Sequence, residues 1–195
     1  SKFLPEIISL SNKFGQSKII YNALIKLKET NNFDSIKNRI LDKEILEMKH
    51  RGISLKENEQ KEFNIISEKL GKLSTNFSNN VLDATNAWYL ILDNKSQIEG
   101  LPERVLELMA ISAHDHLKND GEVDVKNGPW KLSLDIPTYT SYMTYARDRN
   151  LREKLYKSFV SRASQGEKNN SQIIEEILSL RTKQANLLGY KSWAE

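Results

Sequence analysis

The sequence lacks cysteine altogether and holds only three histidines, eight glycines and four prolines in 195 residues. Without cysteine the chain can form no disulfide, no thiolate nucleophile and no Cys-ligated zinc site. Its longest apolar runs, such as residues 88–92, are far shorter than a bilayer requires. No basic stretch followed by an apolar segment opens the chain. We therefore expect a cytoplasmic protein with no membrane partner.

Motifs that carry chemistry are also missing. The sequence has no His-Glu-x-x-His, no Gly-Lys-Ser/Thr phosphate loop and no Gly-x-Ser-x-Gly nucleophile elbow. His114 and His116 are two residues apart on an expected helix, so their side chains point to different faces. His50 lies at an expected helix end, where an imidazole commonly meets free carbonyl groups. The sequence predicts no catalytic residue and no metal ligand in this chain.

The charge of the chain does not indicate a nucleic-acid partner. The net charge is +3 and the pI is near 8.9, but 29 basic residues are scattered among 26 acidic ones. No block of lysine and arginine could contact a run of phosphates. With 38% hydrophobic and 28% charged residues, the composition is typical of a soluble globular protein. A chain of this length can bury a substantial core.

Helical periodicity dominates the sequence. From Glu57 onward, apolar residues recur at steps of three and four and define one face of a long helix. These residues are Phe63, Ile66, Leu70, Leu73, Phe77, Val81, Ala84 and Trp88. Other helices are expected at Pro5–Phe14, Ser17–Lys28, Asp34–Arg51, Pro102–Leu117, Thr138–Arg147, Arg149–Arg162 and Gln172–Leu188. Asp34 and Asp148 are expected N-caps, and Gly189 is the expected C-terminal cap of the last helix.

Two short segments break the helical pattern. Residues 88–92 (WYLIL) are apolar throughout, and residues 130–134 (WKLSL) alternate between apolar and polar. We expect strands near Trp88–Leu92 and Trp130–Leu134 that pair with each other. The loop from Asn119 to Pro129 holds two glycines and a proline and is the expected flexible segment. The fold class predicted is mainly α, a single multi-helix domain over residues 1–195 with a small two-stranded β ribbon.

Short polar side chains form a stripe on the long expected helix. Asn79, Asp83 and Asn86 follow steps of four and three, on a different face from the apolar residues. Such a stripe is most often a solvated face. Because Asn and Asp are poor helix formers, however, the stripe is better explained beside water-filled space or a partner. It is the candidate binding surface.

Two further patterns have a structural and a functional interpretation. Tyr139, Tyr142 and Tyr145 step by three along one short helix, which favours core packing but could line a groove. Arg181 shares a helical row with apolar residues, which favours a buried structural ion pair over substrate binding.

The two ends of the sequence raise the question of a longer parent. Ser192 and Glu195 have the Ser-x-x-Glu spacing of a capping box, which opens a helix. The first residue is Ser1 and not Met. One interpretation is a short frayed tail. The other is a fragment truncated at both ends.

Several segments resemble, in the right order, a known family. They are FGQSKIIYNALIKL (residues 14–27), KLSTNFSNNVLDATNAW (72–88), GLPERVLE (100–107), LSLDIPTYTSYMTYARDRNLREKLYKSFVSRAS (132–164) and IIEEILSLRTKQANLLGYKSWAE (173–195). Together they resemble the thimet oligopeptidase and oligopeptidase A family of zinc metallopeptidases. Residues 122–130 fit the family pattern least well.

The resemblance implies a neurolysin-like, mainly helical N-terminal portion and a parent enzyme that cleaves short peptides with zinc. In the family the zinc is held by a His-Glu-x-x-His helix and a further glutamate, which lie beyond the matching region. None of those positions can be placed on this sequence, so no cofactor is expected in the fragment itself, which is predicted to be inactive alone. The expected partners are the remainder of the same polypeptide and short peptides.

The function predicted is a wall of a substrate channel, with Asn79, Asp83 and Asn86 as wall residues. The alternative is a self-contained helical interaction module with no link to peptidases, in which the tyrosine row or the polar stripe would bind a partner helix.

Overall fold

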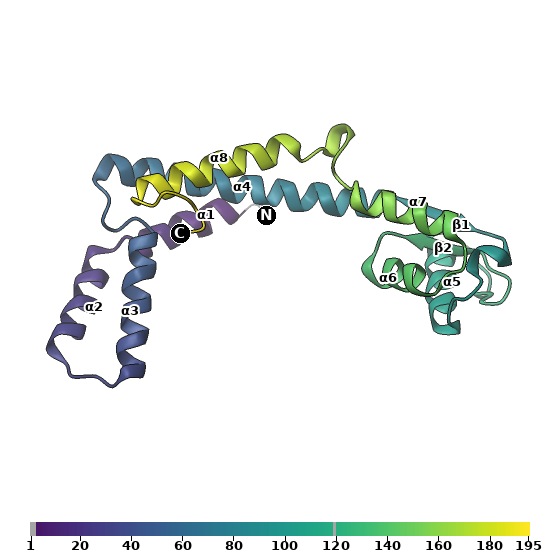
Figure 1. The fold of residues 1–195 in the computed structure, drawn as a ribbon, viewed down its shortest axis with the longest axis horizontal. Helices are drawn as coiled ribbons and strands as arrows, with labels where there is room; N and C mark the ends of the chain where they lie inside the picture. The colour runs from purple at the N-terminus through teal and green to yellow at the C-terminus, as the bar shows by residue number, and fades with distance from the viewer. Residues whose placement is uncertain (1–2, 119) are drawn as a thin grey trace. The chain divides into compact units, whose positions relative to one another are not determined.

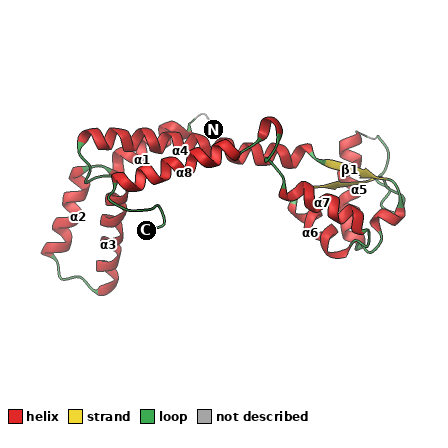
Figure 2. Ribbon diagram, turned by 45° about the horizontal axis from the view of Figure 1, so that its top comes forward, coloured by secondary structure: helices red, strands yellow, loops and turns green. Residues whose placement is uncertain are grey.

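The computed structural model describes residues 3–118 and 120–195, and most of them are helical. The α-helices are α1 (Leu4–Gly15), α2 (Lys18–Thr30), α3 (Ser35–His50), α4 (Glu57–Ala87), α5 (Glu103–Leu117), α6 (Ile136–Tyr145), α7 (Arg149–Val160) and α8 (Ser171–Leu187) (Figure 2). Two short 3-10 helices, η1 (Lys95–Ile98) and η2 (Gly166–Lys168), and strands β1 (Tyr89–Leu92) and β2 (Trp130–Ser133) complete the described elements. The predicted fold class is confirmed. No described helix is both long and apolar enough to pass through a membrane.

The chain forms two compact units. The first comprises Ser1–Phe77 and Ser171–Glu195, and the second comprises Ser78–Asn170. One boundary falls inside α4 and the other immediately before α8. That the whole chain acts as a single domain stays a prediction.

In the first unit, α1 and α8 lie beside the N-terminal part of α4, and α2 and α3 form an antiparallel pair (Figure 1). Ile66 and Leu73 of α4 and Leu180 of α8 are buried against one another, as the period of the long helix predicts. Gln184 of α8, itself buried, donates to the Ser67 hydroxyl at 2.8 Å. Gly71 permits the close approach of α1, because a Cβ there would collide with Ile8.

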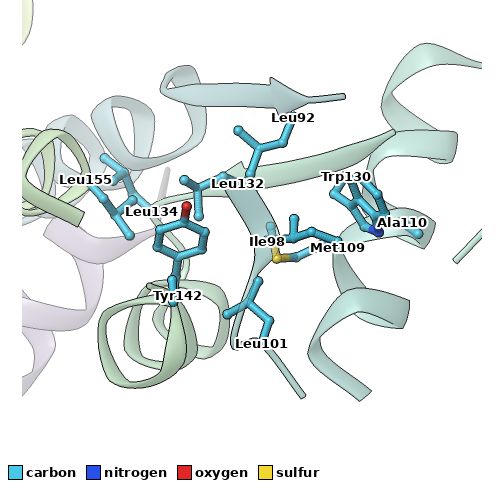
Figure 3. Close-up of a cluster of buried hydrophobic side chains, with 11 residues drawn as sticks. Leu92, Ile98, Leu101, Met109, Ala110, Trp130, Leu132, Leu134, Tyr142 and Leu155 are labelled. Atoms are coloured by element: carbon cyan, nitrogen blue, oxygen red, sulfur yellow. The ribbon is translucent and has the colours of Figure 1, made fainter. Parts of the chain in front are cut away.

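The second unit is built around the β ribbon. β1 and β2 pair antiparallel, with Leu90 opposite Leu132 and Leu92 opposite Trp130. Because side chains alternate across a strand, these two pairs share one face. Figure 3 shows Leu92 and Leu132 directed from the ribbon toward Met109 and Tyr142. Trp130, Leu132, Tyr142 and Leu155 are completely shielded from solvent, so the ribbon supplies the centre of this core.

The predicted caps are confirmed. Asp34 accepts a hydrogen bond from the Lys37 amide at 2.9 Å and Asp148 accepts one from the Leu151 amide at 3.0 Å. Gly189 has a φ of 86°, and the Tyr190 amide donates to the Ala185 carbonyl at 2.9 Å. At the last residues the Glu195 carboxylate accepts a hydrogen bond from the Lys191 amide at 2.7 Å. In a capping box it would accept from the Ser192 amide, so the capping box indicated by the sequence is not formed here.

Candidate functional site

The C-terminal part of α4 carries the candidate polar stripe. Asn79, Asp83 and Asn86 are all exposed, whereas Val81 and Ala84 on the apolar face are partly buried. The helical spacing therefore places the three polar side chains on a solvent-facing surface, as predicted. Their role as substrate contacts stays a prediction.

The connection from α7 to α8 is bound to this part of α4. Lys168 of η2 forms an ion pair with Asp83, with 2.6 Å between Nζ and Oδ2. The Asn80 side-chain amide donates to the Asn170 side-chain oxygen at 2.8 Å. Arg162 donates to the Thr85 hydroxyl at 3.4 Å. Three contacts thus hold residues 161–170, which we call the α7–α8 connection, against one helix.

The electrostatics of the stripe are set by the Asp83–Lys168 pair. Both side chains are half exposed. The hydrogen bond from Lys168 to Asp83, followed by the attraction of the Asp83 charge, raises the pKa of Lys168. Asp83 is therefore partly neutralised by this chain itself. Asn79 and Asn86 offer uncharged amide groups to solvent, each able to donate and to accept hydrogen bonds.

Aromatic stacking anchors the first residues of the α7–α8 connection. The Phe159 ring lies between Tyr139 of α6, with centroids 3.8 Å apart, and the guanidinium of Arg162 at 3.5 Å. Ala163, which is buried, has a φ of 52°. Its carbonyl accepts from the Asn170 amide at 2.8 Å, which closes the loop on itself. A left-handed alanine costs conformational energy, so these contacts outweigh a local strain.

The tyrosine row does not act as one surface. Tyr142 is fully buried and its hydroxyl donates to the Gln97 carbonyl at 2.6 Å. Tyr139 stacks on Phe159, and Tyr145 is half exposed. Burial, followed by the nearby charge of Asp148, raises the pKa of Tyr142 well above its ordinary value. The row is mainly core packing, which was the favoured interpretation.

The prediction for Arg181 was wrong. The side chain is exposed, and its guanidinium carbon lies 5.5 Å from the centre of the Trp193 ring. Ile174 and Leu178 on the same row are also exposed, whereas Ala185 is buried, so only the N-terminal part of the row faces solvent in this chain. A cation over an aromatic ring at the surface needs no buried carboxylate partner.

The histidines do not converge on a metal. His114 Nε2 contacts the Gly121 carbonyl oxygen at 2.6 Å, and the His116 ring packs on Tyr89 with centroids 4.3 Å apart. His50 meets the Tyr190 hydroxyl at 2.9 Å. A catalytic zinc requires three protein ligands around one point. Over residues 3–118 and 120–195 no such group of three His, Cys, Asp or Glu occurs, so these residues do not fit a zinc ion.

Sequence reasoning identified the stripe but missed the residues that bind it. Lys168 and Asn170 are 85 and 90 residues away from their partners Asp83 and Asn80. Lys and Asn are common throughout the chain, and nothing local distinguishes these two. A weak signal was Arg162, a basic residue at the end of the expected helix Arg149–Arg162, between Val160 and Ala163.

Comparison with known proteins assigns the chain to a family. The model for "Neurolysin/Thimet oligopeptidase, N-terminal domain" matches residues 1–61, and that for "Peptidase family M3" matches residues 142–195. The probable cytosolic oligopeptidase A of Arabidopsis thaliana is 40% identical over 194 residues, which is 98% of this chain and 27% of that protein. The chloroplastic/mitochondrial organellar oligopeptidase A of the same plant is 41% identical over 98% of this chain and 24% of its own length.

A bacterial relative agrees with the plant proteins. Oligopeptidase A of Escherichia coli strain K12 is 31% identical over 199 residues, covering 98% of this chain and 28% of its own length. The chain thus spans about a quarter of the length of the curated relatives it matches. Similarity that runs through nearly all of the present residues, in plant and bacterial proteins alike, shows that the chain belongs to the thimet oligopeptidase and oligopeptidase A family, peptidase family M3.

Proposed function

We propose that the chain is a non-catalytic helical portion of a zinc metallo-oligopeptidase that hydrolyses short peptides, and that it forms one wall of the substrate channel. The observation that carries this proposal is the match of 98% of the chain to about a quarter of two oligopeptidases A. The sequence has no His-Glu-x-x-His, so the metal and its general base would come from other polypeptide.

In this proposal the partner is the remainder of the same polypeptide and the substrate is a short peptide. The zinc would supply a bound water as nucleophile and polarise the peptide carbonyl. The present residues would supply shape. A narrow channel admits extended peptides and rejects folded proteins, because unfolding a domain costs ~5–15 kcal/mol. No nucleic acid takes part.

The wall residues of this proposal are Asn79, Asp83 and Asn86. The exposed amide groups of Asn79 and Asn86 can both donate to and accept from a peptide backbone. Asp83 is paired with the Lys168 ammonium group, so the two residues together add little net charge to the wall. An uncharged polar wall would hold peptides of many sequences, which suits an enzyme selective by size.

We place the enzyme in the cytoplasm. One plant relative is described as probably cytosolic and another as chloroplastic/mitochondrial. The composition, without cysteine, suits a reducing compartment. Fractionation of cells with an antibody against this chain tests the assignment, and recovery in a sealed organelle would contradict it.

Inactivity of the isolated chain is tested directly. The chain is incubated with zinc and a quenched fluorescent peptide of about ten residues, beside a full-length oligopeptidase A as positive control. We expect fluorescence no higher than with zinc alone. Cleavage that appears only with both chain and zinc, and that a chelator stops, would overturn the non-catalytic assignment.

The channel-wall role is tested in the whole enzyme of which this chain is proposed to be a part. Asn79→Ala with Asn86→Ala is expected to raise KM for short peptides severalfold and to leave kcat nearly unchanged, because uniform binding is lost. Ser78→Ala, an exposed polar residue of the same helix on a different face, is the control. Unchanged KM for a series of peptide lengths would contradict a wall at this surface.

A second candidate function is protein interaction. α2 has no fully buried residue, and Ile19 is 85% exposed while Ile36 of α3 is 72% exposed. Several large apolar side chains exposed on one pair of helices are typical of a surface that another protein segment covers. The sequence alone left open an interaction module with no link to peptidases, and the family assignment argues against that form of the proposal. Sedimentation at increasing concentration tests it, since a chain that stays monomeric and binds no partner would remove the candidate.

A further inference from the structure

A shallow pocket in the second unit has a composition unlike that of the polar stripe. It has a volume of about 260 Å³ and is lined by Met143 of α6 and by Arg149, Arg152, Glu153 and Tyr156 of α7. Arg149, Arg152 and Tyr156 are spaced by three and four residues, so they share one face of α7. Two guanidinium groups therefore meet a thioether and a phenol ring at one surface.

The two arginines lack acidic partners among the described residues. Neither Arg149 nor Arg152 forms an ion pair within 4.0 Å in the described part of the chain, whereas Arg147 nearby is paired with Glu99 at 2.6 Å. The Nε atom of Arg152 is shielded from solvent and has no hydrogen-bond partner among the described residues. A shielded donor without an acceptor is costly, and in native proteins such groups call for a specific explanation.

The nearby carboxylates are committed to other groups. Glu153 forms an ion pair with Lys157 at 2.6 Å, and this hydrogen bond is the main reason that the pKa of Glu153 is lowered, while the charge of Arg149 makes a smaller contribution without a direct ion pair. Asp148 accepts a hydrogen bond from the Leu151 amide at 3.0 Å as the N-cap of α7. The phenol of Tyr142 donates to the Gln97 carbonyl at 2.6 Å. Neither guanidinium group is therefore neutralised by a direct ion pair with a described carboxylate, and both keep their charge at the surface of the pocket.

The lining decides which anion fits. Arginine presents a planar fork of donors that matches a carboxylate or a phosphate. Glu153 on the rim repels a dianion more strongly than a monoanion. Met143, which is partly buried, and Tyr156, which is half exposed, offer apolar contact beside the cations. A monoanionic carboxylate attached to apolar carbon atoms satisfies all of these features.

We propose that the pocket formed by Met143, Arg149, Arg152 and Tyr156 binds a carboxylate flanked by apolar carbon atoms. Two groups carry this chemistry in a polypeptide: the free C terminus of a peptide that ends in an apolar residue, and the side chain of a glutamate. The carboxylate accepts from the two guanidinium groups, and the adjoining carbon atoms contact Met143 and the Tyr156 ring. This site lies apart from the polar stripe in sequence, and its binding does not depend on any peptidase activity.

The test is a binding titration of the present chain, followed by the NMR signal of the Arg152 Nε–H group. The probes are N-acetyl-leucine for the C-terminal source and N-acetyl-glutamate α-amide for the side-chain source, with N-acetyl-leucine amide as the uncharged match. We expect a saturable shift with at least one acid and binding at least about tenfold weaker with the amide, since the charge-assisted hydrogen bonds are lost. The acid that binds more tightly identifies the source.

Three variants sharpen the test. Arg149→Gln keeps the stem but removes the charge and should weaken binding by about fivefold. Glu153→Gln removes the rim charge and should tighten it by a smaller factor. Arg104→Ala, an exposed arginine of α5, is the control and should change nothing. Equal binding of acid and amide, tighter binding of inorganic phosphate than of either acid, or no effect of Arg149→Gln would each overturn the proposal.

Discussion

Lys168 and Asp83, 85 residues apart in the sequence, form an ion pair with 2.6 Å between Nζ and Oδ2. The pair fastens the α7–α8 connection to α4 beside two further side-chain contacts. Asp83 lies in the middle of the candidate polar stripe and stabilises the α7–α8 connection through this ion pair. Asn79 and Asn86 form no such contact among the described residues. The stripe therefore combines one internally satisfied residue with two that remain open to solvent.

Asp83→Asn should lower the urea midpoint of the second unit slightly, and less so in high salt, because both charges are half exposed and screened. The raised pKa of Lys168 sets the pH range of this contribution. It is complete below the ordinary lysine value of 10.5 and is lost as pH rises through the raised value. Urea melts at pH 7 and above pH 10.5 check this.

A double-mutant cycle with Lys168→Gln separates the pair from the loss of charge alone. Asp120→Asn, an exposed carboxylate without a described hydrogen bond, is the charge-matched control. Strict additivity of Asp83→Asn and Lys168→Gln would show that the pair contributes no coupling.

Met109→Ala should destabilise the second unit by about 2–5 kcal/mol, because the side chain is 1% exposed and its removal leaves a cavity beside the ribbon. Leu108→Ala on the same helix is the matched control, since Leu108 is 53% exposed, and it should cost well under half as much. Chemical denaturation followed by near-ultraviolet circular dichroism measures both. Similar costs for the two variants would contradict the described orientation of α5.

Tyr142→Phe should destabilise the second unit by about 1 kcal/mol, because the Gln97 carbonyl loses a buried hydrogen bond. Burial raises the pKa of the Tyr142 phenol. In wild type its contribution is complete below the ordinary value of 10.0 and is lost as pH rises from there through the raised value. Spectrophotometric titration should therefore find one tyrosine that ionises after the others, and this late step should vanish in Tyr142→Phe.

Asp135→Ala should cost about 1 kcal/mol, because Asp135 is the N-cap of α6 and accepts from the Thr138 amide at 3.0 Å. Burial opposes ionisation of this carboxyl, but hydrogen bonds from Ser133 and then Thr138 outweigh it and lower its pKa. The cap's contribution is present above the ordinary value of 3.8 and is lost as pH falls through the lowered value. Acid titration of stability, with exposed Asp93→Ala as control, tests the prediction.

Local patterns predicted the secondary structure well, because the signals are physical and short-range. The period of apolar residues in α4, the caps at Asp34 and Asp148, and the glycine at position 189 each act within one or two helical turns. The ribbon followed from the contrast of residues 130–134 with the surrounding helical pattern, and the observed register confirms the pairing. A boundary shifted where a proline lies in the first helical turn: α6 begins at Ile136, directly before Pro137 and two residues before the prediction.

Contacts between distant segments could not be read from the sequence. Nothing near Asp83 indicates that Lys168 lies beside it, and the burial of Arg181 was misjudged because an apolar row does not reveal whether another element covers it. The sequence also did not indicate the pair of arginines at the α6–α7 pocket. Whether an arginine lacks an acidic partner depends on which groups the nearby carboxylates bind in the folded chain. Such properties belong to the packed chain and not to any window of residues.

The tryptophans differ in burial between the two units, and Trp88, the second tryptophan of the second unit, is partly buried. Trp130 of the second unit is fully shielded, and its indole donates to the Val125 carbonyl at 3.1 Å, whereas Trp193 of the first unit is 53% exposed. A shielded indole emits at shorter wavelength than one surrounded by water. In a Trp88→Phe background, fluorescence emission resolved by wavelength can therefore distinguish loosening of the ribbon core from events at the other unit, without any attached dye.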